Sequence, residues 1–356
     1  MNIDSLSLTW LLVIFLVAVV AIWIAGIKLS NTTDVLVSRF GIGEAMGGLI
    51  ILAIVTNMPE IAIVTSASFQ HKMGIAIGNI LGGIAIQTVV LVVLDGFGLG
   101  KTNSLTYKAS SLVLVLEGLL VIAVLSLVIT GHELPAKVIF WRITPPGLLI
   151  LIVWVIGIVL IGKARTKLPW IANFKVPGGQ TKPHGHSRQI QDEKSKLKKT
   201  TTAHIVTVFA LSSIITLVAG VALELTGEAI AAHVGMGGVI FGATILAAAT
   251  ALPEISTGLT SIKLGDYQMA VSDIFGGNAF LPVLFLFATL FSGEAVLPEA
   301  QKTDIYLTGL AVLLTIVYIW GLLFRPKKQI INLGIDSLIV LLLYIFGTIG
   351  LFIISS

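Results

Sequence analysis

The sequence contains no cysteine, and charged residues make up only 11% of its 356 residues. The absence of cysteine excludes disulfides, thiolate metal sites and cysteine nucleophiles. Soluble domains carry about 25% charged residues, so this composition cannot build a water-facing surface, and soluble enzymes and nucleic-acid-binding proteins are excluded. Apolar residues are abundant instead, at 56%, and the mean hydropathy is +1.02. The composition therefore predicts an all-α integral membrane protein embedded in a lipid bilayer.

Ten apolar runs are long enough to cross the hydrocarbon core, which requires about 20 residues in a helix. The predicted spans cover residues 7–28, 44–69, 73–95, 109–130, 144–162, 203–226, 237–262, 268–291, 303–324 and 332–354. The first run has no basic region before it and no small-residue cleavage site after it. It is therefore predicted to be a membrane helix and not a cleaved signal peptide.

A long polar stretch, residues 163–202, divides the ten predicted spans five and five. It carries ten basic residues against two acidic ones. Loops on the same side of the membrane as this stretch carry 18 lysine and arginine residues, and loops on the opposite side carry 4. Because basic residues gather in cytoplasmic loops, this distribution predicts a cytoplasmic loop at 163–202 and both termini outside. The expected location is the plasma or inner membrane of a prokaryote, as a multi-pass protein.

An internal repeat relates the two halves. Residues 48–85 align with residues 242–279 without a gap, and 13 of the 38 positions are identical. Because five spans separate the copies, they enter the membrane from opposite sides. The predicted organisation is a first five-helix repeat at 1–162 with its α-repeat at 44–95, the basic loop at 163–202, and a second five-helix repeat at 203–356 with its α-repeat at 237–291. Inverted repeats are typical of secondary transporters, whose substrate site lies near the middle of the membrane.

Each repeat places a proline directly before a glutamate inside an apolar span. The segments read T-N-M-P-E, ending at Glu60, and T-A-L-P-E, ending at Glu254. Proline lacks an N–H and clashes with the carbonyl four residues earlier, so backbone carbonyls before each proline are released from the helix and need a partner. A cation is one such partner. Thr56 and Thr250 lie four residues before the glutamates, on the same helix face.

A second polar residue follows each glutamate by nineteen positions. It is Asn79 in G-N-I-L-G-G and Asp273 in S-D-I-F-G-G. The glycines permit close approach of neighbouring helices, so Glu60, Asn79, Glu254 and Asp273 are predicted to meet at the axis between the repeats. Hard cations such as Ca²⁺ take about 6–8 oxygen ligands of this mixed kind. Ionisable groups inside a membrane are costly and are commonly functional, so a cation site is predicted here.

The paired P-E helices and the G-N/D-x-x-G segments resemble the two α-repeats of the cation/Ca²⁺ antiporter superfamily, which includes the sodium/calcium exchangers. The resemblance covers the whole chain. It implies that the two glutamates are the main calcium ligands and that two alanines contribute backbone carbonyls to flanking sites. The full set of residues that the resemblance implies at the ion sites is Glu60, Glu254, Asn79, Asp273, Thr56, Thr250, Ala53 and Ala247.

The chain also departs from the family pattern. Prokaryotic members usually read G-T-S-x-P-E, whereas Asn57 and Ala251 stand here at the serine positions. Sodium-driven members carry a serine four residues before the Asn or Asp of each repeat, and here those positions are Ile75 and Met269. Several sodium-coordinating hydroxyls are therefore absent. The calcium centre is expected to be retained, and the coupling ion is left open between Na⁺ and H⁺.

We therefore expect a secondary active antiporter that exchanges Ca²⁺ for Na⁺ or H⁺ by alternating access. No H-E-x-x-H, G-x-S-x-G or G-x-G-D signature is present, so an enzyme is not expected. The transported ions are substrates, no cofactor is expected, and neither a nucleic acid nor a protein partner is implied. The alternatives are a cation channel and an antiporter of another cation, such as a Na⁺/H⁺ or K⁺-linked exchanger. Glu117 and Glu224 are further isolated carboxylates, for which packing and functional roles are equally open.

Overall fold

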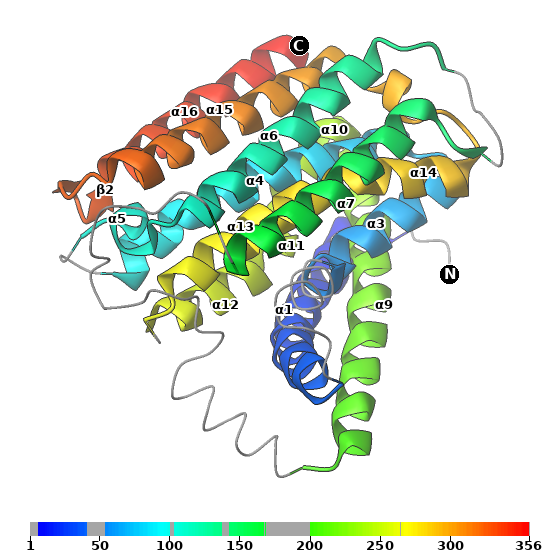
Figure 1. The fold of residues 1–356 in the computed structure, drawn as a ribbon. Helices are drawn as coiled ribbons and strands as arrows, with labels where there is room; N and C mark the ends of the chain where they lie inside the picture. The colour runs from blue at the N-terminus through cyan, green and yellow to red at the C-terminus, as the bar shows by residue number, and fades with distance from the viewer. Residues whose placement is uncertain are drawn as a thin grey trace.

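The computed structural model is a bundle of long helices (Figure 1). It describes residues 6–40, 54–99, 103–136, 142–166, 168, 200–263 and 265–355. The first half contains α1 (Leu8–Arg39), α3 (Met58–Phe69), α4 (Met73–Gly98), α5 (Leu105–Ala109), α6 (Leu112–His132) and α7 (Pro145–Thr166). The second half begins with α9 (Thr202–Val234), α10 (Gly238–Phe241), the π-helix η3 (Gly242–Leu246), α11 (Ala247–Thr250) and α12 (Leu252–Lys263).

The second half continues with further helices and short 3₁₀ turns. Its remaining helices are α13 (Tyr267–Phe280), the 3₁₀ turn η4 (Leu281–Val283), α14 (Leu284–Ser292), the 3₁₀ turn η5 (Leu297–Glu299), α15 (Lys302–Phe324) and α16 (Ile335–Ser355). Two short antiparallel strands, β1 (Gln329–Ile330) and β2 (Leu333–Gly334), join α15 to α16. Within the described residues the protein is therefore almost entirely helical, as the composition predicts.

The described part of the chain contains eight helices that are long and apolar enough to cross a membrane. The segments Gly242–Thr250 and Leu252–Lys263 form a ninth candidate, which is bent by 46°. The predicted span 44–69 lies partly outside the described residues, and only its second part is seen, as α3. The count of ten spans and the inverted orientation of the halves therefore stay predictions.

Burial divides the helices into a central set and a peripheral set. In α4, 83% of the apolar window is buried, and in the segment from α13 to α14 it is 78%, whereas in α1, α9 and α16 it is 22–28%. The peripheral helices expose large apolar side chains such as Val218 and Phe346. Such surfaces favour hydrocarbon as the solvent. The centre of the bundle is consequently the place where buried polar groups lie far from both lipid and water.

The helix α1 is longer than the predicted span 7–28, since it runs without interruption to Arg39. The hydroxyls of Thr32 and Thr33 each donate a hydrogen bond to the carbonyl of Leu29, at 3.0 and 2.8 Å. These bonds satisfy the polar side chains inside the helix, so the polar stretch after Lys28 does not end it. In Figure 1, α1 and α9 lie side by side at one edge of the bundle.

The turns after α3 and after α12 have the same backbone structure, although they lie 194 residues apart. His71 has a φ of 57° and Gly265 has a φ of 79°. The N–H groups of Lys72 and Asp266 donate to carbonyls five residues earlier, both at 2.8 Å. Two segments of equal length, joined to equivalent helices by the same left-handed turn, show that the sequence repeat is also a repeat of local structure.

The central helix α4 packs closely against the π-helix η3. A Cβ atom added at Gly82 would lie 2.1 Å from the Cα atom of Ala243. A Cβ atom added at Gly242 would lie 3.1 Å from both the N atom of Asn79 and the carbonyl oxygen of Ile75. Glycine is therefore required on both sides of this contact. The close approach brings the irregular segment of the second repeat next to Asn79 of the first.

Candidate cation site

Both proline-glutamate segments interrupt their helices at equivalent residues. Asn57 (φ −90°, ψ 19°) precedes α3, and Ala251 (φ −82°, ψ 0°) separates α11 from α12. Regular hydrogen bonding resumes immediately, because Ile61 N donates to Asn57 O at 3.0 Å and Ile255 N donates to Ala251 O at 3.1 Å. Each glutamate consequently lies in the first turn of a helix. The positive end of a helix dipole stabilises a negative charge at that position.

The carboxylate of Glu60 is fully buried and only partly satisfied. Its Oε1 atom accepts a hydrogen bond from Gln87 Nε2 of α4 at 3.4 Å, and the hydroxyl of Thr250 lies against the same carboxylate. Its Oε2 atom has no hydrogen-bond partner among the described residues. Thr250 belongs to the second repeat, so the predicted meeting of the two repeats at this glutamate is seen directly.

The carboxylate of Glu254 interacts electrostatically with two other carboxylates, those of Glu60 and Asp273. It is 4% exposed, and both of its carboxylate oxygens are without a hydrogen-bond partner in the described part of the chain. Asp273 is half-buried, and its Oδ2 atom accepts a hydrogen bond from Thr257 Oγ1 at 3.3 Å. Three acidic side chains from α3, α12 and α13 are thus gathered in the centre of the bundle.

Asn79 lies in the tight contact between α4 and η3. It is fully buried, and neither its Oδ1 nor its Nδ2 atom has a hydrogen-bond partner among the described residues. Buried amides are nearly always paired, so an amide with two unpaired ends is a candidate for ligand binding. Among the described residues, no hydrogen bond joins Asn79 to the carboxylates.

The remaining predicted ligands have different surroundings. Thr56 is half-buried, and the Nδ2 atom of Asn57 lies 3.5 Å from the Oγ1 atom of Thr56. Ala247 is buried, and its carbonyl accepts hydrogen bonds from Ala251 N at 3.1 Å and from Thr250 Oγ1 at 3.2 Å. Ala53 lies outside the described residues. The roles of these three residues stay predictions.

Within the described ranges, no three carboxylate or histidine side chains approach closely enough to form a ready-made metal cage. The cluster instead offers two fully buried glutamates, an unpaired amide oxygen and threonine hydroxyls, next to two helix breaks. The donors around Glu60 are neutral, so they orient the carboxylate without cancelling its charge. Two buried carboxylates with unpaired oxygens can balance the charge of one divalent cation, and hard cations accept such mixed oxygen ligands.

Two polar contacts near the cluster were not predicted. Gln87 bonds Glu60, and Asn278 Nδ2 donates to Thr88 Oγ1 at 3.0 Å. Gln87, Thr88 and Asn278 are at most 1% exposed. A glutamine in the middle of an apolar span is itself a signal, since a buried amide requires a partner, but the sequence does not say which partner it meets.

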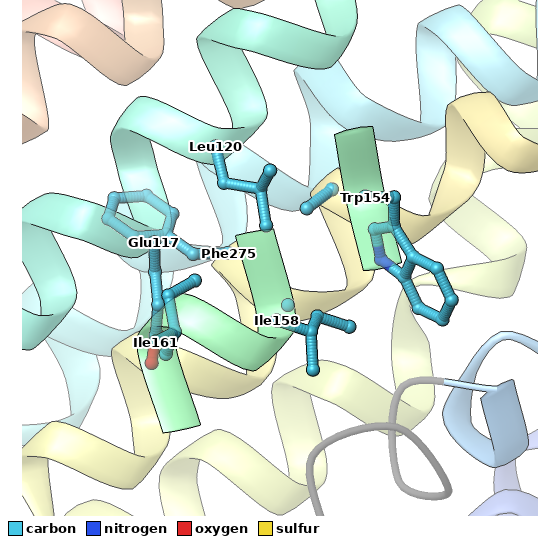
Figure 2. A pocket seen from close by; sticks show the side chains of 8 residues that line it. Glu117, Leu120, Trp154, Ile158, Ile161 and Phe275 are labelled. Atoms are coloured by element: carbon cyan, nitrogen blue, oxygen red, sulfur yellow. The ribbon is translucent and has the colours of Figure 1, made fainter. Parts of the chain in front are cut away.

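Glu117 was expected to be isolated, and it is not. The Arg165 Nη2 atom donates to Glu117 Oε1 and to Ser272 Oγ, both at 2.8 Å. Ser272 directly precedes Asp273, so this ion pair ties α6 and α7 to the helix that carries the third carboxylate. Figure 2 shows Glu117 at one end of a small cavity that is otherwise lined by apolar side chains, including Leu120, and by Trp154.

The helical bundle and its apolar outer faces define a multi-pass membrane protein, with buried carboxylates at its centre. A family model described as "Sodium/calcium exchanger protein" matches residues 10–163 and 204–353. The chain therefore belongs to the sodium/calcium exchanger protein family.

Individual relatives agree with this assignment. The chain is 28% identical over 272 residues to a protein of Alkalimonas amylolytica named "Putative antiporter CaxA". The aligned region covers 75% of this chain and 76% of that protein. It is similar to the solved structure of the H⁺/Ca²⁺ exchanger CAX, with a TM-score of 0.67, 14% identity and coverage of 97% and 86% of the two chains. It is also similar to the sodium-calcium exchanger NCX_Mj, with a TM-score of 0.56, 17% identity and coverage of 96% and 98%. At these identities the two structures show a shared fold.

Proposed function

We propose that this protein is a secondary active antiporter that exchanges Ca²⁺ for Na⁺ or H⁺ by alternating access. The observation that carries the proposal is the pair of buried glutamates, Glu60 and Glu254, one from each repeat. They interact electrostatically, and each has a carboxylate oxygen without a hydrogen-bond partner among the described residues, next to a helix break. Unpaired buried charge is costly. A divalent cation bound between the two carboxylates would offset both charges.

The remaining polar groups complete the proposed site around these glutamates. Asn79 would add its amide oxygen, and Thr56 and Thr250 would add hydroxyls. The backbone carbonyls of Ala53 and Ala247 would line flanking positions for the counter-ion. This ligand set consists only of oxygen atoms, which matches the preference of Ca²⁺.

Asp273 is the residue proposed to respond when Ca²⁺ is exchanged for the counter-ion. With Glu60 and Glu254 it makes three carboxylates, one more than Ca²⁺ neutralises. The third charge must be balanced by another cation, either a proton on Asp273 or Na⁺ beside it. Ile75 and Met269 offer no hydroxyl for Na⁺, whereas carbonyls near the helix breaks offer oxygen. The named relatives support Ca²⁺ as cargo and include one exchanger of each coupling type.

We further propose that residues 163–202 form a cytoplasmic loop between two five-helix repeats and that both termini lie outside. The proposed membrane is the plasma or inner membrane of a prokaryote. The basic residues of the loop support this orientation. The two halves would then have opposite orientations, which is the arrangement that alternating access requires.

The function is tested by the uptake of ⁴⁵Ca²⁺ into proteoliposomes under an imposed Na⁺ or pH gradient. We expect Glu60→Gln and Glu254→Gln each to abolish exchange, because each removes one of the two charges that balance Ca²⁺. Glu133→Gln is the matched control, since this glutamate is exposed at the end of α6, and it should exchange like the wild type. Undiminished uptake by a folded Glu60→Gln or Glu254→Gln protein would refute the assignment.

The counter-ion is tested by Asp273→Asn in the same vesicles. If protons couple, this variant should separate Ca²⁺ movement from the pH gradient and flatten the pH dependence of uptake. If Na⁺ couples, Ile75→Ser combined with Met269→Ser should strengthen Na⁺-driven uptake. A wild-type protein in which neither gradient moves Ca²⁺ would contradict calcium antiport altogether.

A further inference from the structure

The helix α9 carries a line of polar and small residues along one face. Thr216, Gly220, Glu224 and Glu228 follow one another at intervals of four residues, which places them on the same side of the helix. Thr216 and Glu224 are 0% exposed. The opposite face of α9 exposes apolar residues such as Val218. The buried polar residues therefore do not serve to make the helix soluble. The line therefore requires a different explanation.

Glu224 is held by α3, the helix that begins beside Glu60. Its Oε2 atom accepts hydrogen bonds from Ser66 Oγ at 2.8 Å and from Gln70 Nε2 at 2.9 Å. Its Oε1 atom is buried and has no hydrogen-bond partner among the described residues. Both donors are neutral, and the nearest fixed cation, Lys72, attracts the carboxylate from a distance while pairing with Glu228. The hydrogen bonds thus fix the carboxylate in position and leave its Oε1 atom available.

The hydroxyl of Thr216 is also unpaired within the described residues. Other hydroxyls of α9 donate to the carbonyl four residues earlier, as Thr207 and Thr226 do at 2.9 and 2.6 Å. Thr216 does not make this local bond, and its Oγ1 atom is left with its acceptor capacity. Two unpaired oxygens, on Thr216 and Glu224, therefore lie on one buried face about 12 Å apart along the helix.

Between these two oxygens, α9 touches the proline-glutamate segment. A Cβ atom added at Gly220 would lie 3.0 Å from the carbonyl oxygen of Pro59 and 2.7 Å from Ala62 Cβ. Pro59 precedes Glu60, so at Gly220 the face of α9 contacts the backbone next to the proposed calcium site. Beyond Glu224, at the end of the helix, Glu228 forms an ion pair with Lys72 that is about one-third exposed. The face thus extends from the surface of the molecule to the neighbourhood of Glu60.

The corresponding face of α1 lacks these oxygens. With the offset of 194 residues, Gly26 corresponds to Gly220, and it packs against Pro253 as Gly220 packs against Pro59. Ile22 corresponds to Thr216, and Ser30 corresponds to Glu224. The helix contact is conserved between the halves, but the buried carboxylate exists in only one of them. The asymmetry separates this feature from the packing role that both helices share.

We propose that Glu224, together with Ser66, is a binding station for Ca²⁺ on the path between Glu60 and the membrane face at which α9 ends. This proposal rests on the proposed calcium antiport. Since α9 follows residues 163–202 and spans the bilayer, this face is the one opposite the basic loop. A carboxylate held at this depth raises the local concentration of cations before they reach Glu60. Ser30 stands at the corresponding position of α1, so the effect is expected at one face only.

The test measures ⁴⁵Ca²⁺ exchange separately at the two faces, in vesicles whose orientation is read from trypsin cleavage of the lysine-rich loop. In Glu224→Gln, we expect the half-saturating Ca²⁺ concentration to rise about tenfold at the face opposite the loop, the effect of losing roughly one charged contact. The value at the loop face and the maximal rate should be unchanged. Ser66→Ala should shift the same parameter in the same direction, by a smaller factor.

Glu294→Gln is the matched control. Glu294 pairs with His71 at 3.3 Å near the same end of α3, but its side chain is 49% exposed. High salt screens exposed charges, so at high ionic strength this variant should transport like the wild type. The inference is overturned if Glu224→Gln leaves both half-saturation values unchanged or alters both faces equally. If Glu224→Gln fails to fold, Ser66→Ala decides by the same criteria. A wild type without calcium exchange would instead reject the proposed function.

Discussion

Neutral donors surround the buried carboxylates of this protein at several positions. Gln87 donates to Glu60, Thr257 donates to Asp273, and Ser66 donates to Glu224. Each donor fixes the orientation of an oxygen but supplies no positive charge. Such contacts orient the carboxylate oxygens, as the cation site proposed above requires.

Glu117 shows the opposite arrangement, because its partner is a fixed cation. Arg165 pairs with it at 2.8 Å, and the two side chains are 18% and 4% exposed. This carboxylate is consequently neutralised within the protein. We interpret it as a structural group that holds α6 and α7 against α13 next to Asp273.

Removing one partner of this ion pair should destabilise the fold. Arg165→Met leaves the Glu117 carboxylate buried without a counter-charge, and we expect the free energy of unfolding to fall by about 3 kcal/mol. The double variant Arg165→Met with Glu117→Gln should recover much of this loss. The measurement is chemical unfolding in detergent, with the exposed Lys263→Met as control. Equal stability of the Arg165→Met variant and the wild type would show that the pair contributes nothing.

At the scale of secondary structure, the proposed function depends on interrupted helices. The second repeat combines a π-helix, a turn at Ala251 and a bend of 46° before Glu254. π-Helical turns are uncommon and are frequent at functional sites. Here the irregular backbone lies against α4 and is covered by protein, which is the condition under which a membrane tolerates it. The glycines of α4 make this coverage possible.

Two adjacent glycines of α4 differ in how closely neighbouring helices pack against them. Gly82→Ala would place a Cβ atom 2.1 Å from Ala243 Cα, whereas Gly83→Ala would place one 3.4 Å from a side-chain methyl of Leu281. We expect Gly82→Ala to push α4 and η3 apart, to lower the free energy of unfolding by about 1–3 kcal/mol and to abolish exchange. Gly83→Ala should remain close to the wild type in both assays. Similar behaviour of the two variants would contradict the close packing described for α4.

At the scale of the whole molecule, the two halves share a backbone plan and differ in chemistry. Both contain a broken helix with a proline and a glutamate, followed by a left-handed turn. Yet Glu60 has Gln87 as a partner, Glu254 has none among the described residues, and the carboxylate Glu224 has a serine as its counterpart. Alternating access requires two related conformations. The chemical differences would make binding at the two faces unequal.

The orientation of the whole protein is tested with reporters that are active on one side of the membrane. A reporter inserted within residues 163–202 should be cytoplasmic, and fusions at both termini should be external, because the basic loops remain on the cytoplasmic side. Truncation after residue 162 provides the control, since an odd number of spans must move the reporter at the new end to the cytoplasm. An external 163–202 loop would invert the proposed topology.

Much of this architecture could be predicted from the sequence, because it follows from local rules. Apolar runs of membrane length predict the helices. The helices α4, α6, α7, α15 and α16, and the segment from α13 to α14, lie within a few residues of the predicted spans. A proline inside such a run breaks the helix wherever it occurs, so the breaks before Glu60 and Glu254 were expected and are confirmed. The offset of 194 residues also relates the matching turns at His71 and Gly265, which only the structure shows. The family follows from the same motifs.

The partners of the buried polar groups were decided by the tertiary structure alone. Glu117 meets Arg165, 48 residues away, and Glu224 meets Ser66, 158 residues away. In the sequence both glutamates are single carboxylates in apolar spans, and nothing in their neighbourhood distinguishes the one in direct contact with an arginine from the one held by neutral donors. Backbone geometry depends on adjacent residues and leaves a local pattern. The neutralisation of a buried charge depends on which distant helix packs against it, and that is known only when the helices are assembled.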